Sequence, residues 1–101
     1  MIVKHEMYGE TYQLSLQFAK YANGQTAIKL WDMTDGFPFA TATIAVDDQL
    51  LEDEVAIKNY SENEGILFSL IEAGVVDYPH EFIQSGHVNV PVCKLKIVNN
   101  F

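Results

Sequence analysis

The chain has 101 residues, with fourteen Asp or Glu, six Lys and no Arg, which gives a formal net charge of −8. With 49% hydrophobic and 20% charged residues it has the composition of a folded globular protein, and its length predicts a single domain over residues 1–101. The excess of carboxylates and the absence of guanidinium groups argue against direct binding of DNA or RNA, and they favour a basic protein as partner.

Membrane insertion and secretion are not expected from the sequence. No apolar run approaches the roughly 18 residues that a membrane-spanning helix needs, and the N-terminal residues lack the apolar segment of a signal peptide. The single cysteine, Cys93, cannot form an internal disulfide. We therefore expect a cytoplasmic protein.

The first half of the chain has the pattern of an antiparallel meander. Polar and apolar residues alternate over residues 11–19, which is typical of a half-buried strand. Turn-forming residues at 9–10, 23–24 and 34–36 separate this segment from its neighbours. The pattern predicts four strands, over residues 2–8, 11–19, 25–33 and 37–46.

The second half predicts one helix, after a short strand over residues 55–58. Ser61 and Glu64 have the spacing of a capping box, in which the two side chains satisfy backbone N–H groups of the first turn. Apolar residues at 66, 67, 70 and 71 form one face, and Gly74 is a natural terminator. We expect a helix over residues 62–73 that leans on the sheet.

The last predicted strand covers residues 87–98 and follows a loop over residues 75–85. Its apolar residues change phase, from the valines at 88, 90 and 92 to Cys93, Leu95 and Ile97. Such a change indicates either a β-bulge or burial on both faces, and Pro91 favours the bulge. The expected fold class is α+β, with a five- or six-strand, mostly antiparallel sheet and one α-helix packed on one face.

Acidic residues concentrate in residues 47–54, where five of the eight residues are Asp or Glu. The spacing does not fit the calcium-binding loop of an EF-hand. The run is either a solvated face, an acidic recognition surface or a weak divalent-cation site. Two more acids lie in the first turn of the predicted helix. The candidate partner-binding residues are Asp47, Asp48, Glu52, Asp53, Glu54, Glu62 and Glu64.

Metal binding has few candidate ligands. The chain lacks the paired Cys and His spacings of the zinc motifs. His80 lies with Asp77 and Glu81 in one predicted loop, which we interpret as solvated. We expect no cofactor, with a zinc site assembled across strands as the alternative. The weak candidate ligands are His5, Asp77, His80, Glu81, His87 and Cys93.

Catalytic and nucleotide-binding motifs are absent from the sequence. Cys93 lies among apolar residues, where a thiol is usually buried and unreactive. The six glycines form no phosphate-binding motif. We therefore expect no enzymatic activity. Trp31 and Met33 share one strand phase, so they form either an exposed binding face or a buried one.

Four segments resemble a small uncharacterised family that carries only a domain-of-unknown-function label. The segments are residues 21–28 (YANGQTAI), 54–66 (EVAIKNYSENEGI), 72–76 (EAGVV) and 90–95 (VPVCKL). The resemblance covers residues 11–96, and NYSENEG is its most specific piece. Members of that family are encoded on phages, plasmids and other mobile elements of Gram-positive and gut bacteria. The family has no established active site, so the resemblance implies no catalytic residue.

The resemblance implies a role against host defence. Small acidic phage proteins without a catalytic motif are often inhibitors of the anti-CRISPR or anti-restriction type. We therefore expect a non-enzymatic protein of the bacterial host cytoplasm that acts by DNA mimicry, occupying the basic nucleic-acid-binding surface of a host RNA-guided or restriction nuclease. The alternatives are a small metal-binding (zinc) or ligand-binding protein, and a phage or plasmid accessory protein without an inhibitory role.

Overall fold

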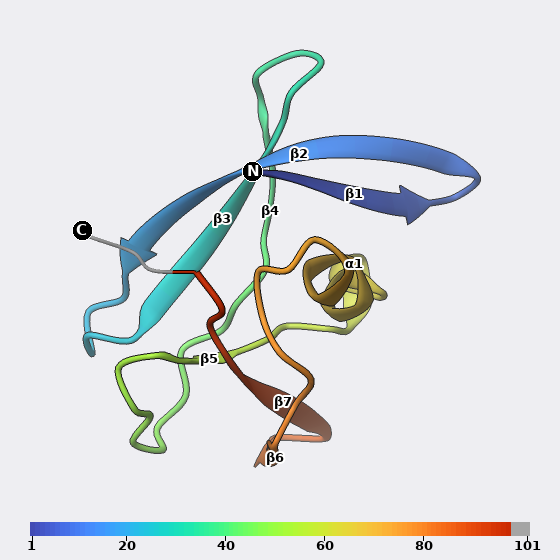
Figure 1. Ribbon diagram of the computed structural model, residues 1–101. Coiled ribbons are helices and arrows are strands. Elements are labelled where there is room, and N and C mark those ends of the chain that lie inside the picture. The colour runs from blue at the N-terminus through green and yellow to red at the C-terminus, as the bar shows by residue number, and fades with distance from the viewer. Residues whose placement is uncertain (98–101) are drawn as a thin grey trace.

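The computed structural model describes residues 1–97 and contains seven strands and one α-helix (Figure 1). The strands form a four-stranded sheet and a three-stranded sheet, and every pairing between them is antiparallel. The chain is therefore α+β, as expected, but its strands are divided between two sheets instead of forming a single sheet of five or six. No helix within residues 1–97 has the length and apolar character needed to cross a membrane.

The first sheet is the predicted meander. Its order is β1 (Ile2–Met7), β2 (Glu10–Lys20), β3 (Thr26–Asp32) and β4 (Pro38–Thr41). The first turn consists of Tyr8 and Gly9, both with positive φ (53° and 79°), one residue before the predicted position. Positive φ at both residues is typical of the hairpin turn that matches the strand twist. β4 ends earlier than predicted, and its register with β3 shifts between Leu30 and Trp31.

The second sheet has the order β5 (Glu54–Ala56), β7 (Val88–Lys94) and β6 (Glu81–Ser85). The prediction of a loop throughout residues 75–85 is wrong, because β6 lies there. In β6 only Ile83 is buried and the apolar Phe82 beside it is exposed, so the segment shows no alternation in the sequence. β7 is shorter than the strand predicted over residues 87–98, and residue 98 lies outside the described residues.

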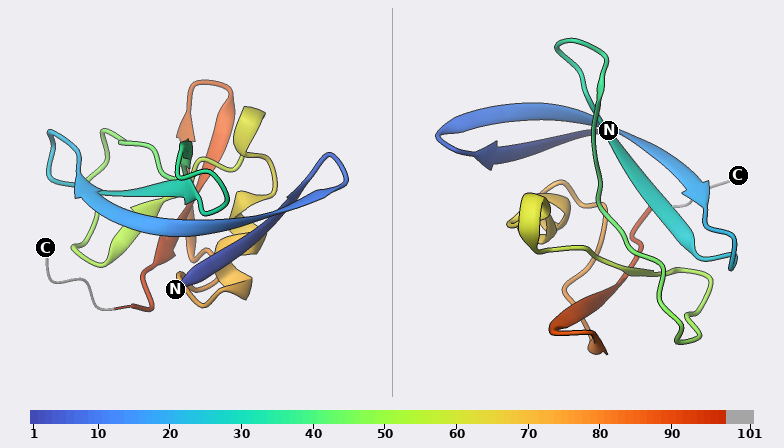
Figure 2. Two further views of the ribbon diagram at one scale, coloured as in Figure 1. Left: turned by 90° about the horizontal axis from the view of Figure 1, so that it is seen from above. Right: turned by 180° about the vertical axis from the view of Figure 1, so that it is seen from behind.

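The two sheets are joined by the segment that follows β4. The Ala42 N–H donates to the Ile28 carbonyl of β3 (2.8 Å), and the Ala42 carbonyl accepts from the Lys58 N–H (2.8 Å). Thr43 forms an isolated bridge with Ile57, directly after β5. This segment therefore connects the last strand of the meander to the second sheet, and Figure 2 shows the two sheets at a steep angle to each other.

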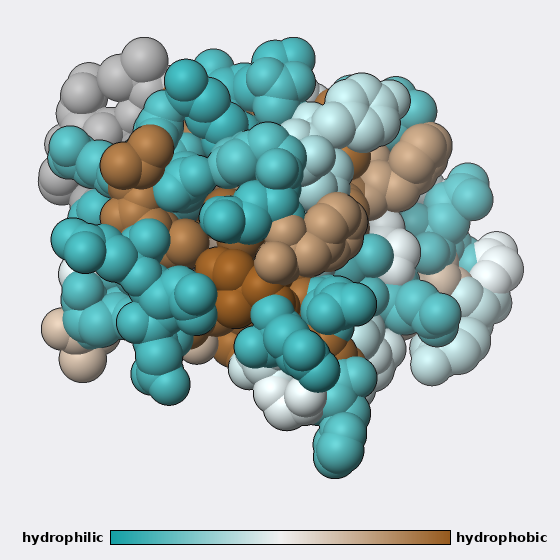
Figure 3. All heavy atoms as spheres, turned by 90° about the horizontal axis from the view of Figure 1, so that it is seen from below, coloured by the Kyte–Doolittle hydropathy of each residue, from teal (hydrophilic) through white to brown (hydrophobic). Residues whose placement is uncertain are grey.

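β7 is buried on both faces because each face packs on a different cluster of apolar residues. Cys93 belongs to the main core with Leu14, Ile28 and Leu70, whereas Val90 and Val92 belong to a smaller cluster. The smaller cluster consists of Val46, Ala56, Ile83, Val90 and Val92. Its side of the molecule, seen from below in Figure 3, has apolar surface in the middle and a hydrophilic rim.

The predicted bulge at Pro91 is wrong. β7 pairs with β5 and with β6 without a shift of register, and Pro91 lies opposite Phe82. The Pro91 carbonyl still accepts from the Ile57 N–H (2.9 Å). Burial on both faces, the other interpretation of the phase change, is the correct one, because the residues on the two phases enter the two different clusters.

The helix begins later than predicted. A 3₁₀ turn, η1 (Ser61–Asn63), precedes α1 (Ile66–Glu72), and Gly65 between them has a φ of 89°. A left-handed residue cannot be part of a right-handed helix, so the helix starts only after Gly65. The helix ends at the expected place, before Gly74 (φ 76°).

The predicted capping box does not form. No side chain caps η1 or α1 at its N-cap residue. Asn59 supplies the missing acceptor instead, because its Oδ1 accepts the Leu67 N–H of the first helical turn (2.9 Å). Asn63, which is buried, donates to the Thr41 carbonyl (2.6 Å) and so attaches η1 to the first sheet.

Candidate functional site

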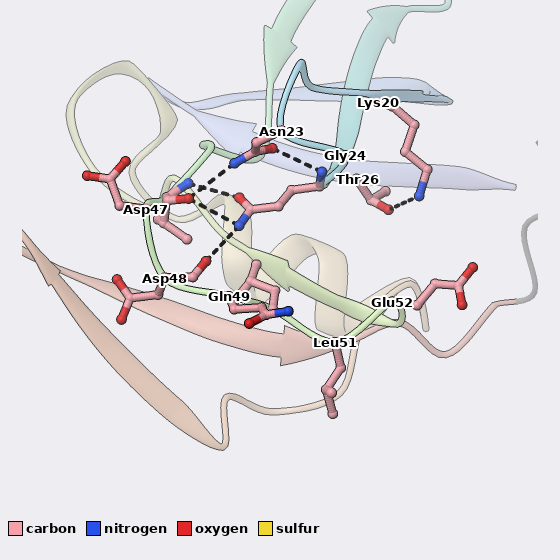
Figure 4. Close-up of a pocket in the computed structure, with 12 residues that line it drawn as sticks. Lys20, Asn23, Gly24, Thr26, Asp47, Asp48, Gln49, Leu51 and Glu52 are labelled. Carbon is pink, nitrogen blue, oxygen red and sulfur yellow. Dashed lines mark hydrogen bonds between the residues drawn. The ribbon is translucent and has the colours of Figure 1, made fainter.

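The acidic loop, which we define as residues 47–54, is held at its first end by two amide side chains of the β2–β3 turn (Figure 4). The Gln25 Nε2 donates to the carbonyls of Val46 (3.1 Å) and Asp48 (2.9 Å), and its Oε1 accepts the Val46 N–H (2.9 Å). Asn23 Nδ2 also donates to the Val46 carbonyl (3.2 Å). These bonds fix the backbone of the loop and leave its carboxylates uninvolved.

The other end of the loop is held through its own carboxylates. Glu54 Oε1 accepts the Leu51 N–H (2.7 Å), and Glu54 Oε2 lies 2.6 Å from His80 Nε2. The hydrogen bond from Leu51 has the larger effect and the contact with His80 the smaller, and both hold the pKa of the Glu54 carboxyl below its ordinary value. Asp53 pairs with Lys94 of β7, with 3.4 Å between Oδ2 and Nζ. Both acids therefore have structural contacts within the chain.

Three carboxylates of the loop remain exposed and unpaired. The side-chain carboxylates of Asp47, Asp48 and Glu52 make no hydrogen bond or ion pair with any other residue in the described part of the chain, although the backbone carbonyl of Asp48 accepts from Gln25. In Figure 4, the side chains of Asp47 and Asp48 point away from Thr26, and Glu52 lies at the opposite end of the loop. A groove of about 590 Å³ runs between the loop and the β2–β3 turn, and Lys20 and Thr26 also line it.

The two remaining candidate acids lie elsewhere on the molecule. Glu62 belongs to η1 and Glu64 follows it, beside α1, whereas the acidic loop lies on the far side of β5 in both Figure 1 and Figure 2. Glu62 forms an ion pair with Lys58, which lowers the pKa of Glu62 and raises that of Lys58. Glu64 is exposed. The seven predicted acids thus form two separate groups.

The metal candidates are also divided. His80 and Glu81 form one group with Glu54, in which the three ligand atoms lie within 4.8 Å of one another. Asp77 lines a groove of about 500 Å³ beside this group. Among residues 1–97 no group of three ligands contains any of the other candidates, His5, His87 and Cys93. Glu54 cannot be recognised from the sequence as a metal ligand, because it lies 26 residues from His80.

The other candidates are exposed or part of the core. His87 is exposed. Cys93 is fully buried, as predicted, and burial raises the pKa of its thiol to about 11, so the nucleophilic thiolate is absent at neutral pH. His5 is 1% exposed, and its Nδ1 lies 2.8 Å from the Ser69 Oγ of α1. His5 Nε2 has no hydrogen-bond partner among the described residues, and burial lowers the pKa of the imidazole.

The Trp31 face is intermediate between the two predicted alternatives. Trp31 is partly buried, and its Nε1 donates to Gln17 Oε1 (2.9 Å). Met33 is 50% exposed, and Phe37, at the end of the same turn, is 68% exposed. Exposed apolar residues that lie singly in turns are ordinary on protein surfaces.

Comparison with known proteins gives no match. Neither the protein-family models, nor the curated proteins, nor the solved structures contain one that is similar to this chain at a significant level.

Proposed function

We propose that the chain is a non-enzymatic binding protein whose acidic loop docks onto a basic surface of a partner protein. One observation carries this proposal: Asp47 and Asp48 are exposed and unpaired on a backbone that Gln25 holds in place. Carboxylates on a fixed backbone bind a cationic surface at a smaller entropic cost than carboxylates on a mobile loop.

The partner in this proposal is a nucleic-acid-binding protein. Such proteins present clustered Lys and Arg to phosphates, and exposed carboxylates on a chain of net charge −8 complement that surface. Because the sequence leads us to expect a mobile-element origin, we further propose that the partner is a host RNA-guided or restriction nuclease, which the protein would inhibit by occupying its nucleic-acid-binding groove.

The test is inhibition of a purified RNA-guided nuclease and a purified restriction nuclease by the full chain. We expect inhibition at stoichiometric concentrations that weakens as salt rises, since exposed charges are screened. The double variant Asp47→Lys/Asp48→Lys should lose at least tenfold in inhibitory potency, because it places cations where the partner is cationic.

A matched control separates the site of the charge from its amount. The double variant Glu6→Lys/Glu72→Lys changes the net charge equally, at two exposed positions outside the acidic loop. It should inhibit about as well as the wild type at moderate salt. Equal loss in both double variants would show that net charge alone matters, and undiminished inhibition by Asp47→Lys/Asp48→Lys would contradict the role of the loop.

A further inference from the structure

The group formed by Glu54, His80 and Glu81 has the composition of a transition-metal site. Its ligand atoms are one imidazole nitrogen and two carboxylate oxygens, all within 4.8 Å of one another. Imidazole together with carboxylate is a ligand set that zinc accepts, whereas calcium and magnesium take oxygen ligands. Two carboxylates and a neutral imidazole also balance the charge of one divalent cation.

The geometry requires little rearrangement to receive an ion. Zinc bound at about 2.0–2.2 Å holds its ligand atoms roughly 3.3–3.6 Å apart. His80 Nε2 and Glu54 Oε2 are already 2.6 Å apart and need only separate slightly. Glu81 is exposed and makes no hydrogen bond through its side chain to any described residue, so its carboxylate can rotate toward them.

Glu54 is oriented for this role before any ion binds. Its side chain is only 12% exposed, and its Oε1 accepts the Leu51 N–H, which leaves Oε2 directed at His80. Hydrogen bonds of this kind, made by the atom that does not bind the metal, fix the direction of a ligand. The groove of about 500 Å³ beside the group leaves room for a water molecule as a fourth ligand.

We propose that Glu54, His80 and Glu81 bind one zinc ion with a water as fourth ligand, in a site that links the starts of β5 and β6 across β7. Because Glu54 is the last residue of the acidic loop and is bonded to Leu51 within it, the bound ion also stiffens the loop. This proposal stands independently of the proposed partner, since the ion alone is the ligand.

The experiment is a calorimetric titration of the full chain, purified without a His tag and treated with a chelator, with zinc chloride. We expect one ion per chain for the wild type. His80→Ala and Glu81→Gln should each weaken zinc binding at least tenfold. Glu81→Gln covers the case in which loss of the His80–Glu54 contact disturbs folding, because Glu81 makes no such contact. Calcium chloride should give no saturable binding.

His87→Ala is the matched control. It removes an exposed imidazole at the other end of β6, outside the metal group, and should leave zinc binding unchanged. A second measurement, hydrogen exchange at the Leu51 amide, should slow on addition of zinc in the wild type and not in Glu81→Gln. The absence of saturable binding at one ion per chain, wild-type affinity in His80→Ala, or equal weakening in His87→Ala would each overturn the proposal.

Discussion

The fold leaves the exposed carboxylates of Asp47 and Asp48 unpaired among the described residues, but it pairs the exposed carboxylate of Glu62. In the acidic loop, Asp47 and Asp48 are exposed with unpaired carboxylates, on a backbone that is bonded to Gln25. At the start of the helix, Glu62 is paired with Lys58. Exposed carboxylates therefore have their charge available for a partner at Asp47 and Asp48, whereas the charge of Glu62 is compensated within the chain.

The comparison shows that the net charge of a segment does not measure its capacity to bind. Of the seven acids between residues 47 and 64, three have a partner in the chain, namely Asp53, Glu54 and Glu62. Reversal of those three would disturb the fold and the surface together. The remaining loop acids can be changed without loss of a described contact, which makes them the informative positions for mutagenesis.

The largest expected effect comes from removing the support of the loop. Gln25→Ala deletes three hydrogen bonds and leaves the N–H of Val46, a 6% exposed residue, without a partner. We expect a loss of about 2–3 kcal/mol in the free energy of unfolding, measured with urea, and faster hydrogen exchange at the Val46 amide. The helix-start region should exchange as in the wild type.

Gln17→Ala is the control for this change. Gln17 is an exposed glutamine of β2, and among residues 1–97 its side chain bonds only to the Trp31 indole. Its loss should cost less than about 1 kcal/mol and leave the Val46 amide protected. If Gln25→Ala were equally mild, the loop would not depend on the amide contacts, and the contrast between the two acidic regions would lose its structural basis.

The sequence predicts the features of this fold that follow from the type of a residue and from its neighbours in the chain. Alternation in β2 predicts a half-buried strand, glycine after the helix predicts its end, and apolar neighbours predict the burial of Cys93. The sequence does not predict features in which a side chain acts far from its own position. Asn59 caps a helix eight residues away, and Gln25 supports a loop 21 residues away.

Of the candidate site, only the concentration of charge can be predicted from the sequence. The concentration of acids at residues 47–54 is visible in the sequence, but which of them are paired depends on His80 and Lys94, from the segments around β6 and β7. The sequence pattern does not identify those segments. The exposed Phe82 removes the alternation of polar and apolar residues from β6, and the two faces of β7 pack on two different apolar clusters. The pairing of β5 with β7 brings Glu54 to His80, and the spacing of these two residues in the sequence does not indicate it.

Acid should affect the two regions in different pH ranges. Burial lowers the pKa of His5, which lies beside the helix start, below 6.5. The imidazole of the unfolded chain therefore takes up a proton more readily than that of the folded chain. The contribution of neutral His5 to the free energy of unfolding is lost as the pH falls below 6.5. The pKa of Glu54 is lowered below 4.5, so its contribution is lost only as pH falls below 4.5. Hydrogen exchange between pH 7 and pH 4 should therefore show loss of protection at Ser69 before Leu51.

A substitution at His5 sharpens this prediction. His5→Phe removes the titrating group while it retains an aromatic ring against Phe39, whose ring lies edge-on to the imidazole at 6.0 Å. The variant should show no fall in the free energy of unfolding between pH 7 and pH 5, whereas the wild type should. A parallel fall in both proteins would assign the acid sensitivity to a group other than His5.

The smallest expected effect is at the ion pair between Lys58 and Glu62. Glu62 is exposed and Lys58 is partly exposed, and ion pairs in contact with solvent contribute little because solvent screens the charges and ordering two long side chains costs entropy. Lys58→Met should leave the urea midpoint within experimental error of the wild type.

Lys58→Met also frees the Glu62 carboxylate, so it converts the compensated region into one that resembles the acidic loop in charge. If binding to a basic partner depends on carboxylates held at fixed positions, Lys58→Met should not strengthen it. A marked gain in affinity would instead show that any uncompensated acid contributes, and that the support of the loop by Gln25 is unnecessary for binding.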